Sequence, residues 1–262
     1  MQGCTVQLSQ RLLIFGICAA TIVCLHPSSP GYLTQQHSVA IAGVDNLLIR
    51  SLLDNNQFYD PLDEALNLGI SSANWPLFGL LWPSGQHMAE RMAKRPVSVE
   101  RILEIGCGLG LASLVAHRRG ASVTASDCHP LAHAFLDENT RLNGLSPIAY
   151  CHGLWGKAAL REDGLPVLTT AQDALPSGVF DLIMGSDILY ERDDEGTLAS
   201  FIHAHAASRS EIWVVDPNRG NRAAFHKQMA SLGFARHEQV LDQPPHEGLP
   251  GYKGRMLTYT RE

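Results

Sequence analysis

The stretch from Arg101 to Gly110 has the spacing of residue types that points most directly to chemistry in this 262-residue chain. A short apolar segment runs into an E-x-G-x-G-x-G pattern made by Glu104, Gly106, Gly108 and Gly110. The sequence LASLVAHRR follows and predicts a helix. A strand, a glycine turn and a helix in this order bring backbone N–H groups up to a nucleotide-like ligand. Glycine suits the turn because side chains there block close approach.

A second acid, Asp127, ends the next apolar segment, about twenty residues after the glycine turn. A doubly wound sheet places an acid there to accept hydrogen bonds from ribose hydroxyls. The dinucleotide fingerprint is G-x-G-x-x-G, but the third glycine here comes one residue early, so a bound pyrophosphate is explained less well. The alternative is an α/β unit with a tight turn and no ligand.

The elements that must position these residues alternate between strand and helix from residue 101 to about residue 230. Two strand-like segments then follow in succession. This order predicts an α/β fold with a doubly wound, mostly parallel sheet and one antiparallel edge strand. A helix is expected over 130–143, and another after Ser84, which is a possible N-cap. Residues 160–177 are expected to form a loop.

Composition and charge narrow the class of protein. A net charge of −6 argues against a broad basic surface, so no nucleic-acid partner is expected. The six cysteines include no C-x-x-C pair, and the twelve histidines are scattered. This pattern favours reduced thiols and predicts no metal site.

The N-terminal 98 residues divide into two predicted parts. Residues 1–40 form an extension whose apolar run over 12–25 is short for a membrane span. It is read as an export signal, a weak anchor or a start-site artefact. Residues 41–98 are expected to be a helical or lid segment in which Trp75, Phe78 and Trp82 crowd together. These aromatics either pack over the sheet edge or cover a ligand, and the main domain is expected over 99–262.

The glycine turn and Asp127 together resemble motif I of the class I S-adenosylmethionine (SAM)-dependent methyltransferases. The resemblance implies a Rossmann-like seven-strand sheet and SAM as cofactor. It also implies that Glu104 lies near the methionine amino group and that Asp127 holds the ribose. Trp82, Trp155 and Ser186 are further candidate cofactor contacts. Trp155 follows the third strand and is an adenine neighbour or a loop tryptophan packed on the core.

A second resemblance rests on Asp187-Ile188-Leu189-Tyr190 at the end of the fourth strand, with LWPSG upstream and DPNR downstream. These motifs resemble the D-x-x-Y protein-lysine methyltransferases. Within them they are similar to the electron-transfer-flavoprotein β-subunit lysine methyltransferases and their bacterial relatives. The resemblance covers roughly residues 75–220. It departs from the family pattern at Ser84 and Asn218, where the family has glycine, and at HGLW after the third strand.

The resemblance implies that Asp187 and Tyr190 are catalytic. Asp187 is expected to orient a lysine amine, and Tyr190 to wall the pocket and stabilise the cation that forms. The alternative is that Asp187 caps the following helix. We therefore expect a SAM-dependent methyltransferase acting on lysine in a protein substrate, as a cytoplasmic monomer. The alternatives are a small-molecule N-methyltransferase with a nicotinamide-like substrate and a non-catalytic SAM-fold binding module.

Overall fold

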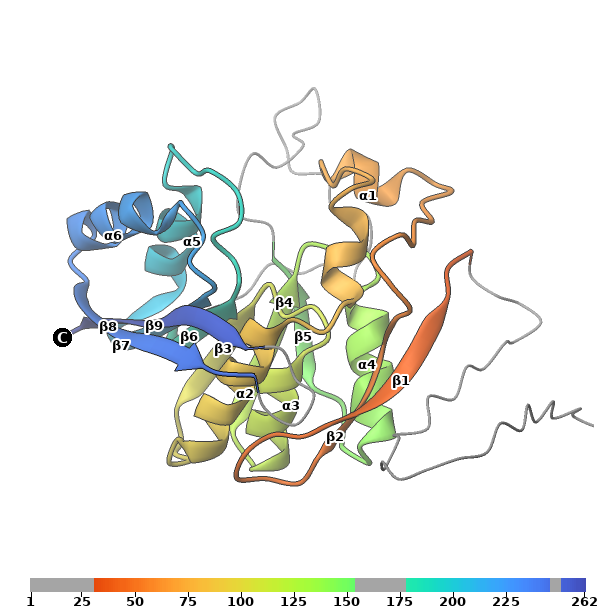
Figure 1. Ribbon diagram of the computed structural model, residues 1–262. Coiled ribbons are helices and arrows are strands. Elements are labelled where there is room, and N and C mark those ends of the chain that lie inside the picture. The colour runs from red at the N-terminus through yellow and green to blue at the C-terminus, as the bar shows by residue number, and fades with distance from the viewer. Residues whose placement is uncertain (1–30, 154–177, 246–250) are drawn as a thin grey trace, which may run out of the picture.

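The computed structural model describes residues 31–153, 178–245 and 251–262 of the chain. They form a seven-stranded sheet with helices on both faces, and a separate two-stranded sheet (Figure 1). The strand order in the large sheet is β5-β4-β3-β6-β7-β9-β8. The strands of this sheet are β3 Arg101–Ile105, β4 Ser122–Asp127, β5 Ala149–His152, β6 Phe180–Ser186, β7 Ala206–Asp216, β8 Ala235–Gln243 and β9 Tyr252–Arg261.

The remaining elements are six α-helices, one short 3-10 helix and a hairpin within these ranges. The helices are α1 Glu64–Asn67, α2 Pro83–Lys94, α3 Leu111–Arg118, α4 Ala132–Leu142, α5 Thr197–His205, α6 Arg222–Ser231 and η1 Trp75–Gly79. The hairpin strands are β1 Thr34–Val39 and β2 Leu47–Leu52, which pair antiparallel.

The pairing of the large sheet confirms the predicted fold class. Strands β5, β4, β3, β6 and β7 are mutually parallel, whereas β9 runs antiparallel to both β7 and β8. The reversed strand lies one place inside the edge, and β8 is the edge strand. The parallel strands therefore end along one border of the sheet, where ligands bind in such folds.

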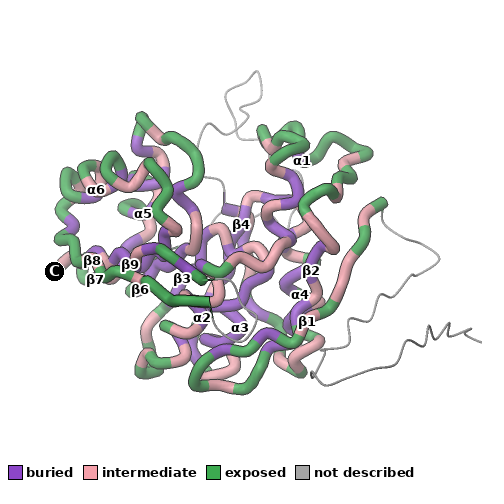
Figure 2. Tube along the Cα trace, viewed as in Figure 1, coloured by how far each residue is buried: buried purple, intermediate pink, exposed green. Residues whose placement is uncertain are grey.

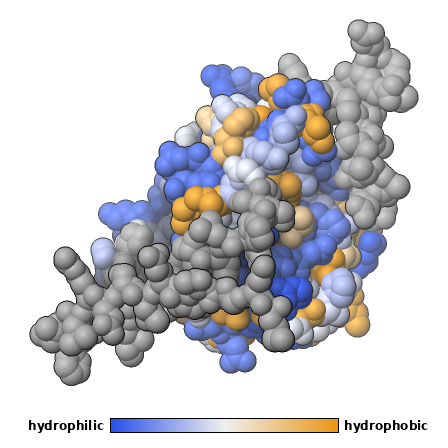
Figure 3. Space-filling view, turned by 90° about the vertical axis from the view of Figure 1, so that its right-hand side faces the viewer, coloured by the Kyte–Doolittle hydropathy of each residue, from blue (hydrophilic) through white to orange (hydrophobic). Residues whose placement is uncertain are grey.

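The central strands β3, β6 and β7 are buried on both faces, as a doubly wound sheet requires, whereas the edge strand β8 is mostly exposed. Neighbouring residues Ile102 and Leu103 on β3 belong to different core clusters, because successive side chains point to opposite faces. One cluster packs α2, α3 and α4 against the sheet, and the other packs α5 and α6. Figure 2 shows the buried centre and the more exposed α6. On the face drawn in Figure 3, hydrophobic residues form small patches among hydrophilic ones.

The N-terminal region differs from the predicted helical segment, because residues 47–52 form β2. Leu47, Ile49 and Ser51 are buried, whereas Leu48 is exposed, so burial alternates with the period of a strand. The boundary predicted at residue 40 falls just after β1, which packs with β2 as one hairpin. The alternation spans only six residues, which is too short to outweigh the helix-like pattern around it.

Two local predictions have different outcomes. The helix expected over 130–143 is confirmed as α4. The predicted capping role of Ser84 is wrong, because α2 begins at Pro83, and the residue at its N-cap, Trp82, makes no side-chain cap bond. The Ser84 side chain is buried and its hydroxyl lies 2.9 Å from the Tyr252 hydroxyl.

Three predictions fall outside the described residues: the apolar run over 12–25, the loop over 160–177 and the candidate adenine neighbour Trp155. In the part of the chain that the structure describes, no helix is long and apolar enough to cross a bilayer.

Candidate active site

The turn between β3 and α3 has the left-handed backbone that its glycines permit. Gly106, Gly108 and Gly110 have φ of 59°, 50° and 74°. A Cβ on Gly108 would lie 2.7 Å from the carbonyl oxygen of Phe78, and a Cβ on Gly110 would lie 2.4 Å from a methyl carbon of Leu136. Gly106 and Gly108 line the central pocket. Gly110 is not among the lining residues, and its small size serves the packing of the turn on α4.

Glu104 is the acid that precedes this turn, and it is 2% exposed. Its carboxyl group accepts hydrogen bonds from the Ser113 backbone N–H, at 2.8 Å, and from the Ser113 hydroxyl. Burial raises the pKa of Glu104 to about 7; the Ser113 hydrogen bonds oppose the shift, and nearby Asp127 adds to it. The side chain borders the pocket. An incoming cation would therefore find an acid that ionises near neutral pH.

Asp127 ends β4, and its carboxylate holds the glycine turn and the loop after β4 at the pocket wall. Its two carboxylate oxygens accept hydrogen bonds from the backbone N–H groups of Gly108 and His129, each at 2.8 Å. Burial raises the pKa of Asp127, and the two N–H donors act in the opposite direction. Each oxygen keeps a second lone pair, which suits a carboxylate that also receives ribose hydroxyl groups.

The predicted aromatic cluster is partly core and partly pocket wall. Trp75 is 1% exposed and packs edge-on against Phe78. Phe78 and Trp82 line the pocket, and Phe78 stacks on the His129 ring with centroids 3.6 Å apart. The indole N–H of Trp82 donates to the Leu77 carbonyl oxygen at 2.8 Å. Both alternatives drawn from the sequence therefore apply, each to different members of the cluster.

Asp187 follows β6 directly and has an unusual backbone. Its φ is 54°, a left-handed value that is uncommon outside glycine. Its backbone N–H donates to the Val215 carbonyl oxygen of the neighbouring strand at 2.8 Å. Its carboxylate accepts two hydrogen bonds from the guanidinium of Arg219, Nε to Oδ1 and Nη2 to Oδ2, both at 2.9 Å. The side chain of Asp187 is 12% exposed.

The capping alternative for Asp187 is not what the structure shows. The next helix, α5, begins ten residues later at Thr197. Its first N–H groups, those of Thr197 and Leu198, donate to the two carboxylate oxygens of Asp193 at 3.0 and 2.9 Å. Asp193 therefore satisfies the helix N-terminus, which leaves the Asp187 carboxylate facing Arg219 and the pocket.

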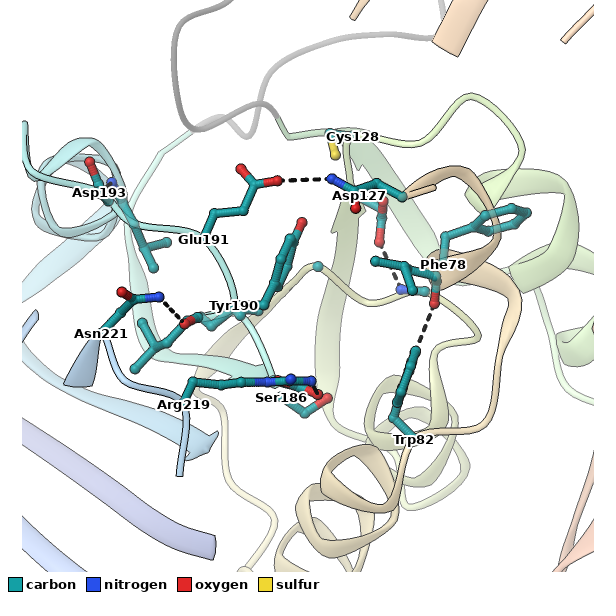
Figure 4. Close-up of a pocket in the computed structure, with 18 of the residues that line it drawn as sticks. Phe78, Trp82, Asp127, Cys128, Ser186, Tyr190, Glu191, Asp193, Arg219 and Asn221 are labelled. Carbon is teal, nitrogen blue, oxygen red and sulfur yellow. Dashed lines mark hydrogen bonds and ion pairs between the residues drawn. The ribbon is translucent and has the colours of Figure 1, made fainter. Parts of the chain in front are cut away.

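Tyr190 lies three residues beyond Asp187 on the same pocket wall. Its side chain lines the pocket and remains 47% exposed. The segment that carries it is held by Asn221, whose side-chain amide donates to the Leu189 carbonyl oxygen at 2.8 Å. Figure 4 shows Tyr190 between Glu191 and Arg219, across the cavity from Phe78 and Trp82.

These groups surround one open pocket of about 970 Å³. It lies over the carboxyl ends of β3, β4 and β6, where a parallel sheet places its ligands. The sequence-predicted residues that it brings together are Trp82, Glu104, Gly106, Gly108, Asp127, Ser186, Asp187 and Tyr190. Among the described residues, no group of three or more metal-ligating side chains occurs.

The sequence did not single out Arg219, His129 or Asn221 as site residues. Arg219 was visible only as the last letter of the DPNR turn, and its contact with Asp187 spans 32 positions of sequence. That contact forms because β6 and β7 are neighbours in the sheet. No local sequence pattern predicts this pairing. The departure at Asn218 is explained by its φ of 64°, because asparagine tolerates the left-handed backbone where the family has glycine.

Comparison with known proteins decides the family. A family model described as "Lysine methyltransferase" matches residues 78–231, more than half of the chain. This chain belongs to that lysine methyltransferase family. Its cofactor is SAM. The glycine turn, Glu104 and Asp127 lie around the pocket.

The relatives within the family are distant. An electron transfer flavoprotein β subunit lysine methyltransferase of Mus musculus is 26% identical over 202 residues, which cover 75% of this chain and 71% of the relative. Protein N-lysine methyltransferase METTL21A of Danio rerio is 29% identical over 126 residues, 47% of this chain and 50% of the relative. Histone-arginine methyltransferase METTL23 of Rattus norvegicus is 29% identical, over 46% of this chain and 50% of the relative. Several matches thus span only about half the relative's length.

Solved structures are similar only in outline. Magnesium protoporphyrin IX methyltransferase of Synechocystis with bound SAM has a TM-score of 0.48 and 17% identity, over 68% of this chain and 79% of that one. A methyltransferase of Pyrococcus furiosus has a TM-score of 0.49 and 14% identity, over 70% of this chain and 87% of that one. The fold assignment follows from the strand order and the family match.

Proposed function

We propose that this family member transfers a methyl group from SAM to the side-chain amine of a lysine in another protein. The observation that carries the proposal is the position of Asp187. Its carboxylate lies at the end of β6, in the same pocket wall as Tyr190 and in the same cavity as Glu104 and Asp127. A cofactor site and an oriented hydrogen-bond acceptor thus share one pocket.

The work left to the protein is mainly positioning, because SAM supplies an already activated methyl group on a positively charged sulfur. The acceptor nitrogen must come to about 3 Å from the methyl carbon and in line with the bond that breaks. Lysine arrives as an ammonium with an unperturbed pKa of about 10.4, so it must first lose a proton. In the proposal, Asp187 accepts a hydrogen bond from the amine. This bond directs the lone pair of the lysine nitrogen into the pocket.

Tyr190 supports the same step from the same pocket wall as Asp187. Its ring lines the pocket and is half exposed, so it can cover a lysine side chain that enters from solvent. The nitrogen gains a positive charge as the new bond forms, and an aromatic face attracts such a cation. In the proposal, Tyr190 therefore forms a wall of the acceptor channel.

The ion pair favours lysine over arginine as the acceptor. The METTL23 relatives are named histone-arginine methyltransferases, so both acceptors occur among the proteins that this chain resembles. The Arg219 fork already occupies both oxygens of Asp187 side-on. A second guanidinium cannot take the same two-bond geometry, whereas one amine N–H still finds a lone pair.

The experiment that tests the proposal is methyl transfer from tritium-labelled SAM by the full-length chain. Two acceptor sources are used: a lysate of a strain lacking the gene, and purified electron transfer flavoprotein β subunit, the acceptor named in the Mus musculus relative. We expect label on a protein band and, by mass spectrometry, a methylated lysine. The Asp187→Ala variant run in parallel is expected to leave the band unlabelled.

The other outcomes distinguish the alternatives. Label confined to the small-molecule fraction would support the nicotinamide-type N-methyltransferase and overturn the protein acceptor. Label on arginine would overturn the argument from the ion pair. SAM binding by calorimetry without any transfer would support a non-catalytic binding module.

We also propose that the protein acts as a cytoplasmic monomer, with residues 99–262 as the methyltransferase domain and the segment over 41–98 packed on it as a partial lid. Fractionation of cells that express the full chain, followed by light scattering of the purified protein, tests both compartment and oligomeric state. Recovery in the membrane fraction would overturn the cytoplasmic location. A mass of twice the chain mass would overturn the monomeric state.

A further inference from the structure

The contact between Arg219 and Asp187 is the feature of the pocket that the proposed reaction does not yet use. The guanidinium meets the carboxylate side-on with two hydrogen bonds of 2.9 Å. The Arg219 side chain lies along the pocket, which it lines, and runs toward Ser186 at the end of β6 (Figure 4). The hydrogen bonds to Asp187 raise the pKa of Arg219 further above its ordinary value, so its charge is permanent.

The backbone on both sides is shaped for this contact. Asp187 has a φ of 54°, and Asn218, which precedes Arg219, has a φ of 64°. Two non-glycine residues in the left-handed region cost free energy that the surrounding structure must offset. The Arg219 backbone N–H donates to the carboxylate of buried Asp216 at 3.1 Å, which fixes the start of the guanidinium arm. Two neighbouring strand ends thus hold the pair in place.

The pair matters because the rest of this pocket wall is acidic. Beyond Tyr190 the lining continues with Glu191, Arg192, Asp193, Asp194 and Glu195. On the other side, Asp216 is 3.4 Å from Arg222, which also approaches Glu238. Tyr252 faces the pair from β9. If Asp187 were unpaired, its charge would add to that of the acidic wall.

An unpaired carboxylate there would favour the wrong form of the acceptor. It would hold lysine as an ammonium, whose nitrogen has no lone pair to attack with. A carboxylate neutralised by a guanidinium still accepts a hydrogen bond but attracts cations far less. Its two oxygens are also held in one plane and direction.

We propose that Arg219 is a positioning residue that fixes the Asp187 carboxylate and neutralises its charge within the pocket. The acceptor channel therefore offers a hydrogen-bond acceptor without a net negative charge at the point of transfer. The role of Asp187 in this inference rests on the proposed function, but the charge compensation itself does not, so the two can be tested separately.

The test measures the affinity of the full chain for SAM and for S-adenosylhomocysteine by calorimetry. The two ligands differ at the sulfur, which is positively charged only in SAM, so the ratio of their dissociation constants reports the charge felt there. In Arg219→Gln the freed carboxylate is expected to shift this ratio in favour of SAM by about three- to tenfold. In Asp187→Asn the unpaired guanidinium is expected to shift it in the opposite direction. Arg219→Lys keeps the positive charge, so its ratio of dissociation constants is expected to match that of the unaltered protein.

Arg192→Gln is the matched control. It removes the same charge from the same pocket lining, but Arg192 pairs with Asp194, and both side chains are largely exposed, so solvent screens the change. Its ratio is expected to stay within twofold of the unaltered protein. Equal shifts in Arg192→Gln and Arg219→Gln, or equal loss of both ligands without a change in ratio, would overturn the inference. Absence of label transfer in the experiment on acceptors would overturn the proposed function and leave the measured ratio intact.

Discussion

In the proposed function, Glu104 is the residue whose ionisation bears most directly on the binding of SAM. Burial raises its pKa to about 7 in the unliganded protein, so the carboxyl group is protonated below that pH. The ammonium of SAM favours the carboxylate form, so binding below pH 7 releases a proton. We predict that SAM affinity rises with pH by at most about tenfold per unit up to pH 7 and is flat above it.

Calorimetry in two buffers of different ionisation enthalpy measures this proton release. The predicted result is close to one proton at pH 5.5 and none at pH 8. Glu104→Gln, which keeps the shape and cannot ionise, should bind with no proton release at either pH. Proton release that persists in Glu104→Gln would show that another group, such as Asp127, carries the linkage.

Single residues also show where local sequence is informative. The pattern around Glu104 and Asp127 predicted two acids that the structure brings to one pocket, because both lie at the carboxyl ends of neighbouring parallel strands. The partner of Asp187 was not predictable, since Arg219 is 32 positions away and is joined to it only by the β6–β7 pairing. Likewise, Asp193 was one of several acids after Tyr190, and only the start of α5 at Thr197 selects it as the acceptor of the first helical N–H groups.

The turn between β3 and α3 works because η1 approaches it closely. A Cβ on Gly108 would lie 2.7 Å from a backbone oxygen of Phe78, and the φ of Gly108 is 50°. We predict that Gly108→Ala costs about 1–3 kcal/mol of folding free energy and weakens SAM binding at least tenfold. Thermal unfolding and calorimetry measure the two effects.

Gly120→Ala is the control for backbone strain alone. Gly120 has a φ of 85°, but a Cβ there meets nothing within 4 Å, and the residue does not line the pocket. It should lose stability without loss of SAM affinity. If both variants bind SAM like the unaltered protein, the close approach of η1 to the turn has no role in the cofactor site.

The N-terminus of α5 depends on Asp193. Its carboxylate accepts the N–H groups of Thr197 and Leu198. We predict that Asp193→Ala lowers the free energy of unfolding by about 1 kcal/mol, which corresponds to roughly 2–4 °C in Tm. Asp194→Ala, in an exposed pair with Arg192, should change Tm by less than half as much. Equal effects would contradict the role of the Asp193 carboxylate at the N-terminus of α5.

Two asparagine side chains attach the hairpin of β1 and β2 to the domain. Each hydrogen-bonds to the backbone of β2, as a neighbouring strand would. Asn139 of α4 accepts from the Arg50 N–H at 2.7 Å and donates to the carbonyl oxygens of Arg50 and Leu109. Asn143 exchanges the same pair of bonds with Leu48. One buried amide therefore joins the hairpin to the glycine turn.

We predict that Asn139→Ala costs about 3 kcal/mol, because it leaves buried backbone groups without partners. Hydrogen exchange should show lost protection in β1 and β2 before the central strands exchange. Asn46→Ala, which removes only an exposed contact with Ser38, should leave the protection unchanged. Unchanged exchange in Asn139→Ala would show that apolar packing alone holds the hairpin.

The mostly parallel, doubly wound sheet with a reversed strand near one edge was predictable from the alternating elements, but the order of its strands was not predicted. The hairpin was not predictable, because its strands have only six residues each and show no clear pattern in the sequence. Asparagine side chains at α4, distant in sequence, bind it to the domain. The shape of the acceptor channel was not predictable either, since it depends on how the segment after β6 folds over α6, through the contact of Asn221 with Leu189.

In the proposed function, Asp187 serves the methyl transfer and not the binding of the cofactor. The most direct measurement compares Asp187→Ala with Asp127→Ala in full-length protein, with SAM affinity from calorimetry and methyl transfer from labelled SAM. We predict that Asp187→Ala binds SAM within about tenfold of the unaltered protein and labels no lysine. Asp127→Ala should lose up to a few kcal/mol of SAM binding, as expected for charge-assisted hydrogen bonds. Asp187→Ala losing SAM as severely as Asp127→Ala, or labelling the acceptor at an unaltered rate, would contradict this role of Asp187.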